Sequence, residues 1–290
     1  MDFHLLDKTE LLIEDIVLDH VNLDRLANSV AIALGLDPRH VAVIDVRPGT
    51  VAMDILRTTV PMEQIAGREQ LLLQALGAVE GVTVSDKTAI RSEGILGMVS
   101  LSQDHLDGLS TRVASISQQI SDAIRFRAMV FPTGDEIVKG NIEDTNTSFL
   151  NSLLTDWGYK VVSGSPLADS LDGVIGALRR AAGMGYGLVI TTGGVGAEDK
   201  DHLVEAITTL DPSAATPYIV HYPHGHWRHQ KDGVRVAVGT FDSTTFIALP
   251  GPHDEVQLAA PVLVQGLAER WGKATLAETL ASTLRAKLIS

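Results

Sequence analysis

The sequence predicts an α/β protein of two domains: a smaller α/β domain of the split βαβ kind in residues 1–102, and a three-layer domain with a parallel sheet in residues 128–290. Two observations predict this class. The chain has 290 residues, of which 45% are hydrophobic, so it is long and apolar enough to form two cores. Short β-rich segments also alternate with segments of helical periodicity along most of the chain.

The first part reads as strand, helix, strand, helix, strand, which is the order of a split βαβ sandwich. β-branched and aliphatic runs mark the strands, and apolar residues spaced three and four apart mark the helices. The expected elements are a strand at 11–18, a helix at 23–34 that ends at Gly35, a strand at 41–46, a helix at 61–76 and extended chain from 83 onward.

A long amphipathic helix is expected at 103–127, between the two domains. Its apolar residues recur at intervals of three and four. They are Leu106, Leu109, Val113, Ile116, Ile120 and Ile124. Because this apolar stripe must be buried, it is expected to pack against either domain or a second copy of the chain, and a homo-oligomer is expected.

The second part alternates strand and helix with short connections, which predicts a parallel sheet with helices on both faces. A turn at 231–233 within the alternating pattern of 218–249 predicts a hairpin or an antiparallel excursion. The expected strands are 128–132, 159–162 and 188–191, and the expected helices are 146–157, 169–182, 200–210 and 255–271.

Composition excludes several classes of function. The formal charge is −13, which disfavours binding to nucleic acid. The chain has no cysteine, so disulfides, thiolate metal sites and cysteine nucleophiles are excluded. No apolar segment approaches the roughly 18 residues needed to cross a bilayer. A cytoplasmic protein without membrane contact is expected.

Three loops follow apolar runs that are expected to form strands. In open α/β sheets, ligands bind at the carboxyl ends of the strands, which is where these loops begin. They are 131–137 with its continuation 140–146, then 191–201, and then 249–255. Each combines glycine with acidic residues. The central loop reads TTGGVGAEDKD, and its glycines allow close backbone approach to an anion at the start of a helix. Carboxylates beside an anion suggest a bridging Mg²⁺. In the alternative interpretation, the glycines only turn the chain and Asp199 or Asp201 caps a helix.

The segments TGDEIVKGNIEDTNTSFLNSLLTDWGYKV, TTGGVGAEDKD and LPGPHDE together resemble the molybdopterin-binding fold. That fold is shared by molybdenum-cofactor biosynthesis proteins and the N-terminal domain of CinA-type proteins, and the resemblance covers about residues 126–270. It implies catalytic roles for Asp135, Asp169 and Asp201, with Asp135 and Asp201 as metal ligands. It also implies ligand-binding roles for Thr133, Gly134, Glu136, Asp144, Asn146, Thr192, Gly193, Gly194, Gly196, Pro250 and Gly251.

The last loop departs from the insertase-type pattern, because Pro252 comes one place early and His253 follows it. This moves the resemblance toward the CinA-like branch. Asp169 also has a structural alternative, since the sequence from Asp169 to Asp172 reads as a helix N-cap.

The resemblance implies binding of molybdopterin or a related nucleotide or pyrophosphate ligand, with Mg²⁺-dependent nucleotidyl transfer or metal insertion in molybdenum cofactor biosynthesis. The alternatives are a CinA-like pyrophosphatase acting on ADP-ribose and a non-catalytic ligand sensor. In each case the partner is a small phosphate-bearing molecule. The first domain is expected to carry no catalytic centre.

Four histidines in HYPHGHWRHQ form a separate cluster. They are His221, His224, His226 and His229. They could bind zinc or, with Arg228, a phosphate. The alternative is a polar hairpin tip that faces solvent.

Overall fold

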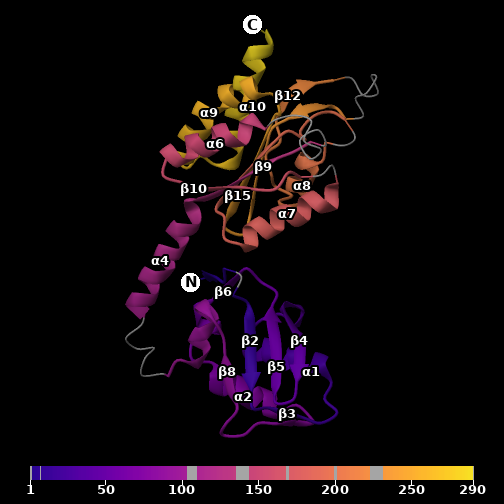
Figure 1. Ribbon diagram of the computed structural model, residues 1–290, viewed down its shortest axis with the longest axis vertical. Coiled ribbons are helices and arrows are strands. Elements are labelled where there is room, and N and C mark those ends of the chain that lie inside the picture. Colours follow the sequence, from indigo (N-terminus) through magenta and orange to yellow (C-terminus); the bar gives the residue numbers. More distant parts are fainter. Residues whose placement is uncertain are drawn as a thin grey trace. The chain divides into compact units, whose positions relative to one another are not determined.

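The computed structural model describes residues 2–6, 8–102, 110–134, 144–167, 170–198, 201–222 and 231–289. The chain divides into two compact units, Met1–Ser121 and Asp122–Ser290 (Figure 1). Helix α4 (Ser110–Arg125) lies in the segment where the connecting helix was expected. No described helix combines the length and the hydropathy needed to span a bilayer.

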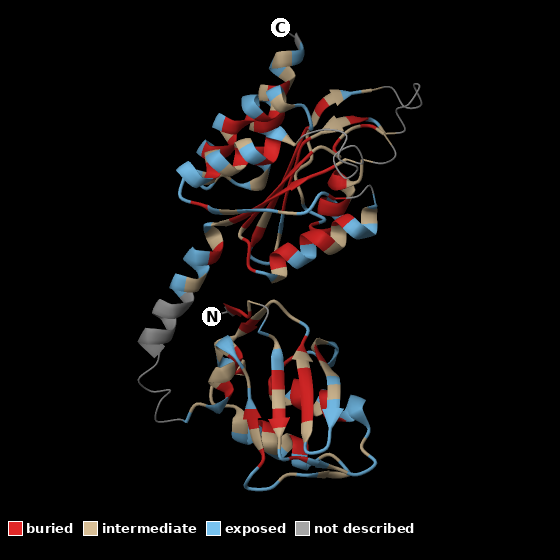
Figure 2. Cartoon of the chain, in the orientation of Figure 1, coloured by how far each residue is buried: buried red, intermediate tan, exposed pale blue. Residues whose placement is uncertain are grey.

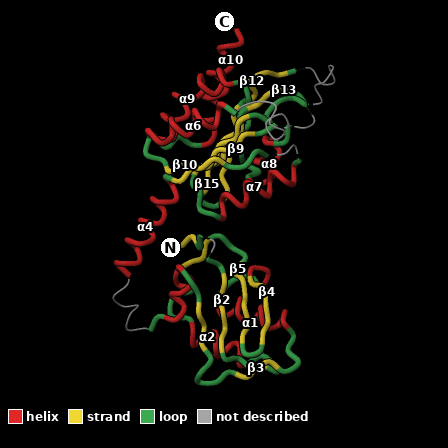
Figure 3. Tube along the Cα trace, viewed as in Figure 1, coloured by secondary structure: helices red, strands yellow, loops and turns green. Residues whose placement is uncertain are grey.

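The first unit contains a four-stranded antiparallel sheet with the strand order β4-β5-β2-β8 (Figure 3). Helix α1 (Leu23–Ala33) connects β2 to β4, and α2 (Glu69–Gly77) lies between β5 and β8 along the chain. Because β5 is antiparallel to both β2 and β4, those two strands run parallel on either side of it, which is the predicted split βαβ arrangement. The strands are β2 (Glu10–Glu14), β4 (Val41–Arg47), β5 (Thr50–Ile55) and β8 (Ala89–Arg91).

The core of this unit follows the strand and helix periods. In β2, Leu11 and Ile13 are buried, and they share one apolar cluster with Leu26 and Val30 of α1 (Figure 2). The side chain of Asn22 caps α1 by accepting from the backbone N–H of Arg25 at 3.0 Å. One face of the sheet is therefore covered by the helices.

The helix expected at 61–76 is shorter than predicted. Residues Thr59–Pro61 form strand β6, which pairs with β1 (Asp2–His4). A short 3₁₀ turn follows at Met62–Gln64, and Gly67 then adopts a φ of 68°, which an α-helix does not permit. The α-helix therefore begins only at Glu69.

The second unit has the strand order β10-β9-β11-β15-β14, in which the first four strands are parallel. All five residues of β11 are buried, as expected for a strand covered on both faces. Strand β14 pairs antiparallel with β15 at the edge, through a tight turn in which Asp242 has a φ of 51°. The strands are β9 (Arg127–Pro132), β10 (Lys160–Ser163), β11 (Leu188–Thr192), β14 (Ala237–Phe241) and β15 (Thr244–Leu249).

Helices cover both faces of this sheet, so the predicted three-layer α/β class is confirmed (Figure 1). One apolar cluster joins the sheet to α6, α9 and α10, and another joins it to α7 and α8. The helices are α6 (Thr145–Asp156), α7 (Leu171–Gly183), α8 (Leu203–Leu210), α9 (His253–Ala268) and α10 (Lys273–Ile289).

The hairpin expected around residues 231–233 is an excursion from the main sheet. Strand β12 (Tyr218–His221) pairs with β13 (Gly233–Arg235) as a separate antiparallel ribbon. Gly233 has a φ of 153°, and an added Cβ would lie 1.9 Å from the carbonyl oxygen of Val220, so only glycine fits there.

The carboxylate of Asp211, which is 6% exposed, ties together α8, β14 and α10. Its Oδ2 accepts from Lys273 Nζ at 2.6 Å and from the N–H of Thr240 at 2.8 Å, while Oδ1 accepts from the N–H of Ser213 at 2.9 Å. Burial raises the pKa of Asp211, but the hydrogen bonds from Lys273, Ser213 and Thr240 outweigh burial and hold the pKa well below its usual range. The stabilisation is therefore present above the unfolded carboxyl pKa of about 3.9 and is lost as the pH falls.

Replacing Lys273 with Met should lower the free energy of unfolding of the second unit by about 3 kcal/mol, because it leaves a buried carboxylate without its charged partner. Lys287→Met on the same helix is the matched control. Lys287 pairs with the exposed Asp254 and should contribute less than about 1 kcal/mol. Urea unfolding followed by tryptophan fluorescence measures both losses, since all three tryptophans lie in the second unit. An equal loss of unfolding free energy in the two variants would contradict the stabilising role of the pair between Lys273 and Asp211.

Candidate functional site

The three predicted loops meet at the carboxyl ends of β9, β11 and β15. In the sheet register, Pro132 lies beside Thr192, and Thr192 lies beside Leu249. The hydroxyl of Thr133 donates to the carbonyl oxygen of Thr192 at 2.9 Å, and the N–H of Gly193 donates to that of Leu249 at 2.9 Å. The loops are therefore joined by hydrogen bonds where each strand ends.

The glycine loop, residues 193–198, begins with two residues in the left-handed region. Gly193 has a φ of 88° and Gly194 a φ of 64°. A Cβ added at Gly193 would lie 2.6 Å from Thr133 Oγ1, and one added at Gly251 would lie 3.5 Å from the Cα of Gly193. The absence of side chains lets the backbones of the three loops lie against one another.

The carbonyl groups of the glycine loop are bonded to neighbouring elements, while four successive amides are not. Gly194 O accepts from the N–H of Leu203 at 3.1 Å, Val195 O from that of Arg235 at 3.3 Å, and Ala197 O from that of Lys231 at 3.1 Å. The N–H groups of residues 194–197 donate to no acceptor in the described part of the chain. Free consecutive amides at a loop before a helix form a binding site for an anion.

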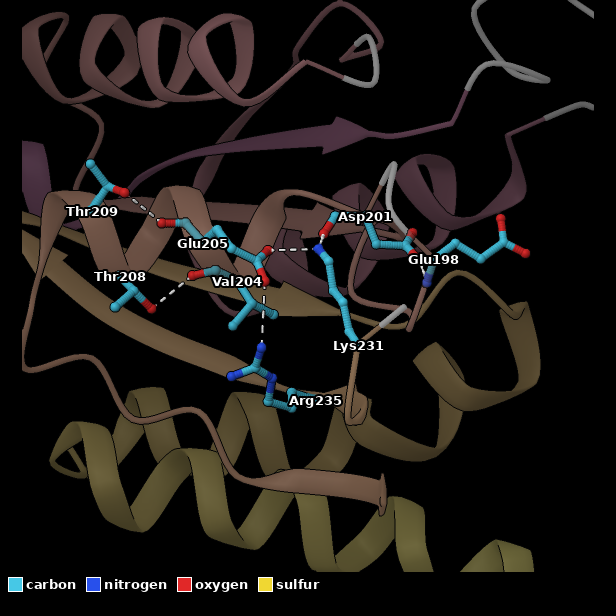
Figure 4. Close-up of polar contacts among 8 residues, drawn as sticks. All are labelled: Glu198, Asp201, Val204, Glu205, Thr208, Thr209, Lys231 and Arg235. Carbon is cyan, nitrogen blue, oxygen red and sulfur yellow. Dashed lines mark hydrogen bonds and ion pairs between the residues drawn. The ribbon is translucent and has the colours of Figure 1, made fainter. Parts of the chain in front are cut away.

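Two basic side chains and Glu205 brace this loop from outside (Figure 4). Lys231 Nζ donates to the backbone carbonyl of Asp201 and lies 3.1 Å from Glu205 Oε2. Arg235 lies 3.4 Å from the other carboxylate oxygen of Glu205. The Lys231 and Arg235 side chains are only 18% and 24% exposed, so this ion-pair group is partly screened from solvent.

The carboxylate of Asp201 closes the end of the glycine loop. Its Oδ2 accepts from the N–H of Glu198 at 2.9 Å, and a Cβ added at Gly196 would lie 2.4 Å from that oxygen. Asp201 therefore does not cap α8, whose N-cap residue is His202. Among the described residues Oδ1 has no hydrogen-bond partner, and Asp201 is partly exposed.

Asn146 joins the first loop to the last. Its Nδ2 donates to the carbonyl oxygen of Gly251 at 2.7 Å, and its Oδ1 lies 2.7 Å from Nδ1 of His253. Asp144 is the N-cap of α6 and accepts from the N–H groups of Asn146 and Thr147 at 3.1 Å. The DTN segment therefore starts a helix and holds the two loops together.

Several predicted residues lie elsewhere or outside the described residues. Asp135, Glu136 and Asp169 are not described, so their catalytic and metal roles stay predictions. The N-cap of α7 is Ser170, whose hydroxyl accepts from the N–H of Gly173. No three histidine or acidic side chains lie close enough together to hold a metal in the parts of the chain the structure covers.

The remaining predicted ligand residues all lie at the loop junction. Gly134 follows Thr133 with a φ of 116°, and Pro250 directly follows β15. Of the histidine cluster, only His221 is described, at the end of β12, where its ring lies 4.8 Å from that of Tyr218. The other three histidines and Arg228 lie outside the described residues.

Sequence reasoning missed the bracing residues Glu205, Lys231 and Arg235. They belong to a helix and a hairpin that are distant in sequence from the glycine loop, and no local motif marks a cation whose partner is a backbone carbonyl. The sequence marked His253 as a departure from a family pattern but indicated no role for this residue. A signal did exist there, since His253 stands at a strand-end loop, where ligand-binding residues gather.

A family whose members are described as a probable molybdopterin binding domain matches residues 129–270. This match confirms the resemblance predicted from the three motifs.

Curated relatives match a shorter segment. A CinA-like protein of Syntrophotalea carbinolica is 38% identical over 72 residues, which are 25% of this chain and 17% of that protein. A CinA-like protein of Thermosipho melanesiensis is 34% identical over 82 residues, which are 28% of this chain and 20% of that protein. The chain thus spans about a fifth of the length of these relatives.

Among solved structures, the protein CinA of Thermoplasma acidophilum aligns with a TM-score of 0.41 at 23% identity, over 49% of this chain and 98% of that chain. The molybdopterin biosynthesis enzyme MoaB of Thermus thermophilus aligns with a TM-score of 0.39 at 22% identity, over 50% of this chain and 95% of that chain.

Gly193→Ala should lower the free energy of unfolding of the second unit by about 1–2 kcal/mol, because alanine is strained at this positive φ and its Cβ meets Thr133 Oγ1. Gly251→Ala is the matched control, since its Cβ makes only ordinary contacts, and it should change stability by less than about 0.5 kcal/mol. Urea unfolding measures both. A Gly193→Ala variant as stable as the wild type would show that the loop relaxes freely.

Proposed function

We propose that the second unit binds a small phosphate-bearing ligand of the pterin or nucleotide pyrophosphate class at the three-loop junction. One observation carries the proposal: the four consecutive amides of residues 194–197 donate to no described acceptor, while the carbonyl groups of Gly194, Val195 and Ala197 accept from the N–H groups of Leu203, Arg235 and Lys231. Such a row of N–H groups matches the oxygens of a phosphate. The description of the matching family, which names molybdopterin, supports this ligand class.

The junction also fits a hard cation beside the anion. Asp201 uses Oδ2 within its own loop, and among the described residues Oδ1 has no hydrogen-bond partner. Asp201 would hold Mg²⁺ through that oxygen, together with the predicted ligand Asp135. A bound Mg²⁺ would neutralise negative charge on a phosphoanhydride. The chain's own part is to bind and orient the ligand through the loop amides and to keep Asp201 in place through the N–H of Glu198.

Binding and turnover separate the possible roles of this site. Molybdopterin, Mg-ATP and Mg-ADP-ribose would each present phosphate to the same amides. A ligand that binds only the folded protein raises its stability by about 2.7 kcal/mol at a hundred times its Kd. Thermal unfolding of the full chain with each compound identifies the ligand, and product analysis then shows whether the site is catalytic or serves as a sensor.

Asp201→Asn should abolish the Mg²⁺-dependent part of ligand stabilisation and leave the melting temperature of the free protein unchanged. The asparagine oxygen can still accept from the N–H of Glu198, so the loop keeps its closure and loses only the charge that a cation needs. Asp156→Asn, at the far end of α6, is the matched control and should behave as the wild type. Retention of the full Mg²⁺ effect in Asp201→Asn would remove Asp201 from the cation site.

A further inference from the structure

The hydrogen bonds of Asn146 determine which nitrogen of His253 carries a proton. The carbonyl oxygen of Gly251 can only accept, so the group of Asn146 that faces it at 2.7 Å must be Nδ2. The other amide atom, Oδ1, also can only accept, and it lies 2.7 Å from Nδ1 of His253. Nδ1 must therefore carry the proton, and in the neutral ring Nε2 holds the lone pair.

The ring of His253 is held in this orientation. Asn146 is 8% exposed, so its amide is confined, and the ring of Phe149 packs edge-on against the imidazole with centroids 5.6 Å apart at 81°. A flipped imidazole would place a carbon against Asn146 Oδ1 and lose the hydrogen bond. In the described part of the chain Nε2 has no hydrogen-bond partner, and the residue is partly exposed.

His253 stands within the three-loop junction. It is two residues from Gly251, whose backbone lies against that of Gly193 at the start of the glycine loop. Asn146, which orients the ring, also links the first loop to the last. The junction thus offers free amides for a phosphate and, a few residues away, an imidazole nitrogen that can accept a proton.

We propose that His253 is the general base of a hydrolytic reaction at this site, with Asn146 as its positioning residue. Nε2 takes a proton from a water molecule, the water oxygen forms a bond to phosphorus, and the bond from that phosphorus to the bridging oxygen breaks, with the electron pair leaving on the departing phosphate. This inference rests on the proposed function and narrows it to hydrolysis of a pyrophosphate bond. Transfer to a phosphate acceptor would need no such base, because that nucleophile is already ionised.

The protonation of the ring is tested without any ligand. Nitrogen-15 NMR of the full chain with labelled histidine distinguishes a protonated from an unprotonated ring nitrogen. His253 should show Nδ1–H in the wild type and a mixture of tautomers in Asn146→Ala, while His221, outside the junction, should give the same signals in both. A wild-type His253 protonated at Nε2 alone would overturn the assignment.

The catalytic role is tested with ADP-ribose and MgCl₂. His253→Asn keeps a donor for Asn146 Oδ1 and removes Nε2, so kcat should fall about 10²- to 10⁴-fold with little change in KM. Added imidazole should restore part of the activity of His253→Ala, which a purely structural role would not predict. An unchanged kcat, or a change in KM alone, would show that His253 is not the general base. A wild type that binds no phosphate-bearing probe would instead overturn the proposed function itself.

Discussion

The direction of the peptide groups in residues 194–197 is the constraint on which the candidate site depends. Each peptide carries a donor and an acceptor on opposite sides, so fixing the carbonyl groups also fixes the amides. Here the carbonyls of Gly194 and Val195 accept from Leu203 of α8 and Arg235 of β13, which fixes the two peptide groups whose N–H belongs to Val195 and Gly196. The two positive φ angles at the start of the loop make this turn sterically possible.

The bracing group extends this constraint beyond the loop. Lys231 and Arg235 each supply a backbone N–H to the loop and a side chain to Glu205, so the same two residues hold the loop backbone and neutralise the helix carboxylate beside it. Lys231 also reaches the carbonyl oxygen of Asp201. The hairpin therefore serves the central loop although it lies outside the main sheet.

The sequence was informative where local pattern determines structure. The order of strands and helices predicted the split βαβ arrangement, and the three glycine-containing loops were predicted from the apolar runs before them. The sequence pattern did not predict the features that depend on contacts between residues distant in sequence. Helix α10 was not predicted, and Lys231 and Glu205 are 26 residues apart with no shared motif. The proton position on His253 follows from a chain of two hydrogen bonds, which no sequence spacing encodes.

The end of α9 shows that the limit of a family match is not the limit of a folding unit. The match stops at residue 270, yet Leu276, Leu280 and Leu284 of α10 belong to the same apolar cluster as the central strands. The apolar core of the second unit thus includes residues beyond the matched segment. A fragment cut at residue 270 would lose these buried leucines and expose the apolar surface that they cover, so the matched segment depends on α10 for a complete core.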